Sequence, residues 1–217
     1  MTLRFGTIPT NGRDCVDRAV SSLLPQVDYL AVIEAGPTVI KRTYPEQVSI
    51  FTDEIEPLNI SRWWNLGLEW AQTVAMSLEE NVWDIAIIND DVEVPPTWLC
   101  YIADDMRQLG CVGACSGGNG SSAVIHRAPA TVSAFTRLQG FAFVLAGESG
   151  IRANEEYRWY FSDDHIDFTA RTLGGSVMFP GCHVTHRHPN SQMTPDMQVI
   201  IAEDAAKFHA QWGVMPT

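Results

Sequence analysis

The apolar run from Ile85 to Ile88 ends abruptly in the polar sequence Asn89-Asp90-Asp91. A short apolar run bounded by turn residues is typical of a buried strand. The polar residues then lie at the carboxyl end of that strand, where the ligand crevice of an open α/β sheet is found. Carboxylates at this edge can bind a divalent cation, which in turn binds phosphate. The alternative is a strand-ending turn without a ligand.

Strand-like and helix-like segments alternate along most of the chain. We expect strands over residues 3–8, 29–33, 48–52, 85–88, 141–145 and 176–179. Apolar residues at helical spacing predict helices capped by Asp14 and Ser61, a third after Pro95-Pro96, and two more over 166–173 and 195–212. The glycine-rich segment 116–122 has no periodicity and is expected to be a mobile loop. The alternation predicts one α/β domain with a mainly parallel central sheet, flanking helices and a C-terminal helix.

The composition narrows the class of protein. The chain has 217 residues, 46% of them hydrophobic, which is enough for one sizeable core. Its formal net charge of −12 disfavours nucleic acid as a partner. Without a run of ~20 apolar residues or a leader-like amino terminus, we expect no membrane span and a cytoplasmic location. The five cysteines lack paired spacing and are expected to be reduced.

A second acidic cluster, Asp163-Asp164, lies at the start of the helix expected over residues 166–173. Carboxylates there are stabilised by the helix dipole and can serve only as caps. A carboxylate on a rigid helix start that faces a crevice can also accept a proton from an attacking hydroxyl. Two adjacent acids raise each other's pKa toward the range that such a general base needs.

Three of the six histidines, His183, His186 and His188, lie close together after the strand expected over residues 176–179. Alternate spacing puts His186 and His188 on the same side of an extended segment. Imidazole is a ligand for Mn²⁺ and other transition metals, and a purely structural role is the alternative. The spacing does not decide which of the two histidines binds a metal.

Seven motifs follow one another along the chain. They are Ile8-Pro9-Thr10-Asn11-Gly12-Arg13, Val32-Ile33-Glu34-Ala35-Gly36, Ser61-Arg62-Trp63-Trp64-Asn65-Leu66-Gly67, Ile88-Asn89-Asp90-Asp91-Val92, the acidic segment from Trp159 to Arg171, Val184-Thr185-His186, and Phe208-His209-Ala210-Gln211-Trp212-Gly213. Their order resembles that of the short GT-A-fold glycosyltransferases, especially the inverting family-2-like enzymes that use nucleotide-diphosphate sugars. The resemblance covers nearly the whole chain, with Glu34 in place of the usual aspartate and Gln211 in place of a lysine.

The resemblance implies a single GT-A (Rossmann-like) domain over residues 1–217. Residues 1–94 form the nucleotide-sugar-binding half, 95–193 the acceptor-side half, and 194–217 the C-terminal helix. The implied donor-binding residues are Pro9, Thr10, Asn11, Arg13, Glu34, Arg62, Asn65, Asn89, Asp90 and Asp91. Asp91 and His186 are the implied ligands of Mn²⁺ or Mg²⁺, and Asp164, or its neighbour Asp163, is the implied general base.

The implied reaction transfers a sugar from a nucleotide-diphosphate sugar, with a UDP-sugar favoured, to an acceptor hydroxyl with inversion. Two other functions fit a similar sheet. A nucleotidyltransferase of related fold usually has a glycine-rich basic loop near the amino terminus, for which residues 9–13 are too short and too poor in glycine. A non-catalytic nucleotide-sugar-binding module would tolerate loss of the acids, whereas acids and histidines coexist here. The acceptor stays open between a protein, a glycan and a small molecule.

Overall fold

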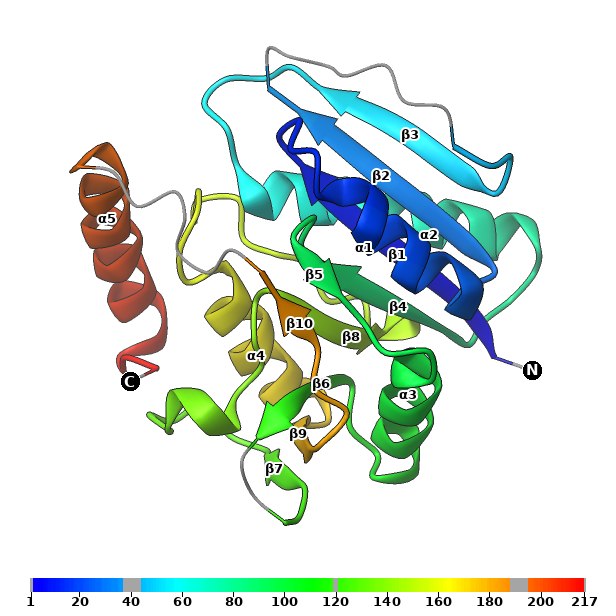
Figure 1. Ribbon diagram of the computed structural model, residues 1–217. Coiled ribbons are helices and arrows are strands. Elements are labelled where there is room, and N and C mark those ends of the chain that lie inside the picture. The colour runs from blue at the N-terminus through cyan, green and yellow to red at the C-terminus, as the bar shows by residue number, and fades with distance from the viewer. Residues whose placement is uncertain (1, 37–43, 119–120, 188–194, 217) are drawn as a thin grey trace.

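A computed structural model describes residues 2–36, 44–118, 121–187 and 195–216. Its centre is a sheet in the strand order β3-β2-β1-β4-β8-β6-β9-β7 (Figure 1). The strands are β1 (Leu3–Thr10), β2 (Tyr29–Ala35), β3 (Val48–Asp53), β4 (Trp83–Ile88), β6 (Gly113–Gly118), β7 (Val124–His126), β8 (Ala142–Ala146) and β9 (Ser176–Pro180). A separate two-stranded ribbon pairs β5 (Val92–Glu93) with β10 (Thr185–His186).

The sheet is mixed, and its amino-terminal half is parallel. Strands β3, β2, β1 and β4 run in one direction, so their carboxyl ends share one edge. β8 is inserted antiparallel between β4 and β6, while β6 and β9 are again parallel. Of the seven pairings within the central sheet among the described strands, four are parallel, as the alternating pattern predicts. The sequence did not predict β6 or β7, whose composition and length give little strand signal.

Helices cover both faces of the sheet and explain why β4 is apolar throughout. One core cluster contains Ala86 and Ile88 together with residues of α1 (Val16–Leu23) and α3 (Trp98–Gln108). The other contains Ile85 and Ile87 together with residues of α2 (Ile60–Ser77) and α4 (Ser162–Leu173). Alternate side chains of a strand point to opposite faces, so a strand that is covered on both sides needs a continuous apolar run.

The two expected helix caps are wrong, and in both cases the helix begins at a different residue. The residue before α1 is Cys15, whose side chain makes no capping hydrogen bond, in place of Asp14. α2 begins at Ile60, and Asn59 caps it by accepting a hydrogen bond from the Arg62 backbone N–H at 3.1 Å. Ser61 therefore lies inside the first turn.

The C-terminal helix α5 (Pro195–Trp212) has the bounds expected from the sequence. It packs against α4 through Phe208, which is buried with Tyr157 and Phe168. Near its end, the Trp212 ring lies 5.7 Å from the ring of His165 on α4, measured between centroids. None of the helices among the described residues combines the length and apolar composition needed to cross a membrane.

Acidification is expected to weaken the packing of α5 on α4. Burial lowers the pKa of His165, and a hydrogen bond with Gln211 opposes that shift. The folded state therefore favours the neutral ring. The stability from this site is present above the unfolded pKa of about 6.5 and is lost as the pH falls through the folded pKa. Denaturant unfolding at pH 7 and pH 5 should show a smaller loss of stability for His165→Gln than for the wild type.

The exposed histidine of α5 supplies a matched control for this experiment. His209→Gln removes an exposed ring and leaves the His165 site intact, so this variant should lose as much stability between pH 7 and pH 5 as the wild type. An equal loss of stability in His165→Gln and the wild type would contradict the assignment.

Candidate functional site

The carboxyl ends of the parallel strands bring several of the expected donor-binding residues to one edge. Thr10, at the end of β1, lies in register with Glu34, near the end of β2. β1 also pairs with β4, so the turn after Ile88 lies beside the turn after Thr10. Glu34 is buried at this edge. The topology therefore gathers residues from three separate motifs at the edge where ligands of open α/β sheets bind.

Asp90 fixes the loop after β1 to the end of β4. Its carboxylate accepts hydrogen bonds from Thr10 Oγ1 at 2.8 Å and from Arg13 Nε at 3.0 Å, and a second Arg13 nitrogen forms an ion pair with it. Asp90 is only 2% exposed. Burial raises the pKa of Asp90, while Arg13 and Thr10 oppose the shift. Its oxygens are thus occupied by the protein, and Asp90 shapes the site.

Asp91 and His186 meet through the small ribbon of β5 and β10. His186 lies opposite Val92 in this ribbon, and the Arg187 N–H donates to the Asp91 carbonyl at 3.0 Å. His186 Nε2 is 3.4 Å from Asp91 Oδ1, and the His186 ring stacks on Phe141 at 4.7 Å between centroids. Burial would raise the pKa of Asp91, but His186 and Arg13 hold it below its usual value.

This pair is compatible with a divalent cation. Asp91 is 4% exposed, and its Oδ1 has no hydrogen-bond partner within the described part of the chain. A carboxylate oxygen beside an imidazole nitrogen is a donor set suited to Mn²⁺. No group of three or more His, Cys, Asp or Glu residues that could hold a metal ion occurs in the described ranges. A hard cation often uses one or two protein ligands and completes its shell with water and substrate phosphates. The other candidate ligand, His188, lies outside the described residues.

A small pocket of about 60 Å³ lies at the same strand ends. The expected donor-binding residues that line it are Pro9, Thr10, Asn11, Arg13, Asn89 and Asp90. The aromatic part of its wall comes from Trp63 and Trp159, whose rings pack edge to face at 5.7 Å. Ligand pockets usually measure at least ~300 Å³, so this pocket is smaller than a typical small-molecule site.

Arg62 and Asn65 do not line this pocket. The Arg62 guanidinium donates from Nε to Asp53 Oδ2 at 2.8 Å, and the indole N–H of Trp63 donates to the same oxygen at 2.8 Å. Asn65 exchanges two hydrogen bonds with the Ala153 backbone, each 2.9 Å long. Arg62 thus orients the pocket wall through Asp53, the acid at the end of β3. Asn65 joins α2 to the segment before α4.

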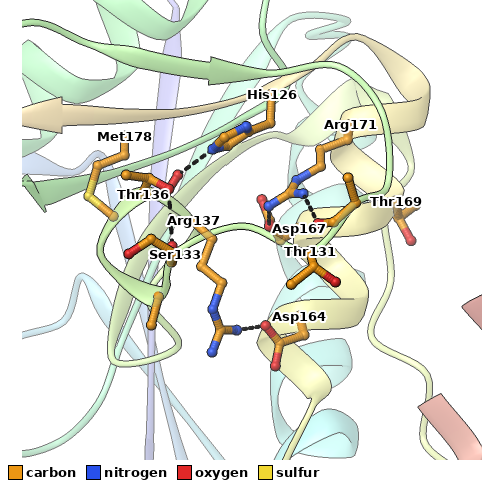
Figure 2. A network of polar contacts seen from close by, with 12 residues as sticks. His126, Thr131, Ser133, Thr136, Arg137, Asp164, Asp167, Thr169, Arg171 and Met178 are labelled. Carbon is orange, nitrogen blue, oxygen red and sulfur yellow. Dashed lines mark hydrogen bonds and ion pairs between the residues drawn. The ribbon is translucent and has the colours of Figure 1, made fainter. Parts of the chain in front are cut away.

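The second acidic cluster lies in the first turn of α4, as expected. Asp163 Oδ2 accepts a hydrogen bond from the Gly140 N–H at 3.1 Å. Burial raises the pKa of Asp163, and the charge of Arg137 opposes the shift. Asp164 is 4% exposed and forms an ion pair with Arg137, a residue that the sequence did not single out (Figure 2).

The segment from Arg137 to Phe141 connects the two acidic clusters. At its first residue it contacts Asp164, and at Gly140 it contacts Asp163. At its last residue, the Phe141 ring stacks on His186 and the Phe141 carbonyl accepts a hydrogen bond from the Asn89 N–H at 2.9 Å. Five residues span at most about 18 Å. The candidate base and the candidate metal ligands are thus connected by one short segment of the chain.

The segment before α4 is fixed by a carboxylate from α5. The backbone N–H groups of Arg158, Trp159 and Tyr160 all donate to Asp204 Oδ2 at 3.1 Å. Asp204 is fully buried. Because Trp159 forms part of the pocket wall, the C-terminal helix positions a residue of the site.

Comparisons with known proteins show the fold. No protein-family model matches the chain, and no curated protein matches it. The structure is similar to residues 1–349 of S. aureus TarS, with a TM-score of 0.54 and 12% identity over 96% of this chain and 72% of that one. A longer S. aureus TarS structure gives a TM-score of 0.57 and 11% identity over 96% of this chain and 40% of that one.

GalNAc-T7, in a crystal structure with UDP, GalNAc and Mn²⁺, is similar at a TM-score of 0.57 and 10% identity, over 86% of this chain and 44% of that one. This chain thus spans less than half the length of two of the three structures. All three have the GT-A glycosyltransferase fold, and at these identities the likeness concerns the fold alone. The expected fold class is therefore confirmed.

Loss of the Asp204 charge is expected to loosen the wall of the pocket. Asp204→Asn keeps the shape of the side chain but weakens the hydrogen bonds from three backbone N–H groups, at a cost of about 1–3 kcal/mol in the free energy of unfolding. Hydrogen exchange should become faster at the amides of residues 158–160. The exposed neighbour gives the control, because Glu203→Gln should change neither quantity. Unchanged exchange at these three amides in Asp204→Asn would refute the positioning role.

Proposed function

We propose that this protein is a glycosyltransferase that transfers a sugar from a nucleotide-diphosphate sugar, with a UDP-sugar favoured, to an acceptor hydroxyl with inversion. The observation that carries the proposal is the segment Arg137–Phe141, which contacts Asp164 at one end. At its other end it contacts His186, the neighbour of Asp91. The GT-A fold supports this reading.

On the donor side, we assign the nucleotide to the pocket at the ends of β1 and β4. Trp63 and Trp159 offer aromatic surface for the base, and Thr10 and Arg13 lie beside Asp90 at the same edge. Asp91 and His186 would hold Mn²⁺ or Mg²⁺, which when bound supplies charge neutralisation for a departing diphosphate. The crystal structure of GalNAc-T7 with UDP and Mn²⁺ is consistent with this assignment.

On the acceptor side, we assign the general base to Asp164. Its carboxylate takes the hydroxyl proton as the acceptor oxygen bonds to the anomeric carbon, and the bond between that carbon and the diphosphate breaks on the opposite side. Asp163 is less available as a proton acceptor because it already accepts a hydrogen bond from the Gly140 N–H. The contact of Asp164 with Arg137 must change before a hydroxyl can reach the carboxylate.

Metal-dependent binding of one nucleotide tests the donor assignment. We expect titration calorimetry with UDP, GDP, dTDP and CDP to show one nucleotide that binds more tightly with Mn²⁺. Asp91→Asn should weaken that binding by at least about tenfold, because loss of even an outer-shell partner of a metal costs that much. Asp105→Asn, on α3 and away from the strand ends, is the matched control. Failure of all four nucleotides to bind would refute the donor assignment.

Turnover tests the base. Asp164→Asn should lower kcat by about 10²–10⁴-fold, the usual contribution of a general base, while leaving nucleotide affinity unchanged. Release of nucleotide from a UDP-sugar by the wild type also separates an enzyme from a non-catalytic binding module. A variant with full turnover would rule out Asp164, and a large loss in Asp163→Asn alone would move the role to its neighbour.

A further inference from the structure

Arg137 and Arg171, which lie close to Asp164 and Asp167 in Figure 2, differ in how many contacts their guanidinium groups make with the protein. Arg171 is completely buried, forms an ion pair with Asp167, and donates to the Ala130 carbonyl at 2.9 Å. Its guanidinium also lies over the Phe168 ring at 4.8 Å. These contacts indicate that Arg171 has a structural role: it holds the segment near Ala130 against α4.

Arg137 has a much poorer set of partners. Its side chain is 16% exposed, and its one ion pair within the described ranges is with Asp164. The buried Nε has no hydrogen-bond partner among the described residues, and the same is true of Arg171 Nε. The two arginines differ in the hydrogen bond that Arg171 donates to a backbone carbonyl and in its contact with an aromatic ring. A guanidinium has five N–H donors in a planar fork that matches the oxygens of a phosphate or carboxylate. A largely buried fork that is only partly used keeps N–H donors that a second oxyanion could accept.

The pair with Asp164 also constrains how a base at this position could work. Removing one partner from a buried ion pair leaves the other charge uncompensated. A neutral acceptor that drew Asp164 away from Arg137 would leave the positive charge of the guanidinium buried and uncompensated. An acceptor with its own negative group would replace the carboxylate on Arg137 as it approached, and the ionised Asp164 would be free to accept the hydroxyl proton.

We propose that Arg137 is a binding residue for an oxyanion carried by the acceptor, a phosphate or a carboxylate group. This inference rests on the proposed function, in which Asp164 is the base. The site then selects acceptors that are hydroxyl compounds with a nearby negative charge. The donor diphosphate is the other possible source of such an oxyanion, but Arg137 lies at the end of the Arg137–Phe141 segment away from His186.

Titration with inorganic phosphate tests the site without knowledge of the acceptor. Calorimetry should detect phosphate binding that weakens at least about tenfold in Arg137→Gln, because a charge-assisted pair of hydrogen bonds is lost. Arg127→Gln removes the same charge from an exposed arginine whose hydrogen bonds, within the described ranges, go to two backbone carbonyls, so it should not change phosphate affinity. Asp164→Asn should strengthen phosphate binding, because the competing carboxylate is gone.

A second titration with saturating UDP and Mn²⁺ separates the two sources of oxyanion. Phosphate binding that depends on Arg137 and persists with UDP supports an acceptor group. Binding that UDP abolishes would overturn the acceptor assignment and give Arg137 to the donor diphosphate. Phosphate affinity that is equal in the wild type and Arg137→Gln would overturn the proposal altogether. If UDP does not bind at all, the donor assignment fails, while the titration without UDP still decides whether Arg137 binds an oxyanion.

Discussion

The ion pair between Arg13 and the buried Asp90 is the contact on which the geometry of the site depends. Asp90 follows the central strand β4, and Arg13 lies in the loop that leads from β1 into α1. A carboxylate buried to this extent must be paired, because the cost of desolvating an isolated charge is large. The pair therefore fixes the loop after β1 relative to the end of β4. It also places a positive charge beside Asp91, whose other neighbour is His186.

The site is assembled from parts of the chain that are distant in sequence. The strand ends supply the pocket and the acidic turn, while the segment that precedes β8 carries Arg137, Gly140 and Phe141. Each of these three residues contacts a different polar group of the site, namely Asp164, Asp163 and His186. A movement of this segment would change the surroundings of the candidate base and of the candidate metal ligands together.

The sequence predicted the regular elements best where apolar spacing was strong. The bounds of α5 and the apolar run of β4 are examples, because both depend on local periodicity. It failed for β6, where small and glycine residues give no strand signal, and for the caps of α1 and α2, which depend on a shift of one or two residues. The strand-end acids were predictable from a topological rule. The roles of Arg137, Asp53 and Asp204 were not, because each depends on a tertiary contact that leaves no local pattern.

The carboxylate of Asp204 has a consequence for the order in which this protein becomes functional. This carboxylate, which belongs to α5, accepts hydrogen bonds from the three backbone amides of residues 158–160. During synthesis, the strands and α2 can leave the ribosome and pair before α5 exists. The Trp159 side of the pocket has no such support until α5 has emerged and docked on α4. The sheet can therefore form first, whereas the Trp159 side of the pocket reaches its final position only when α5 arrives.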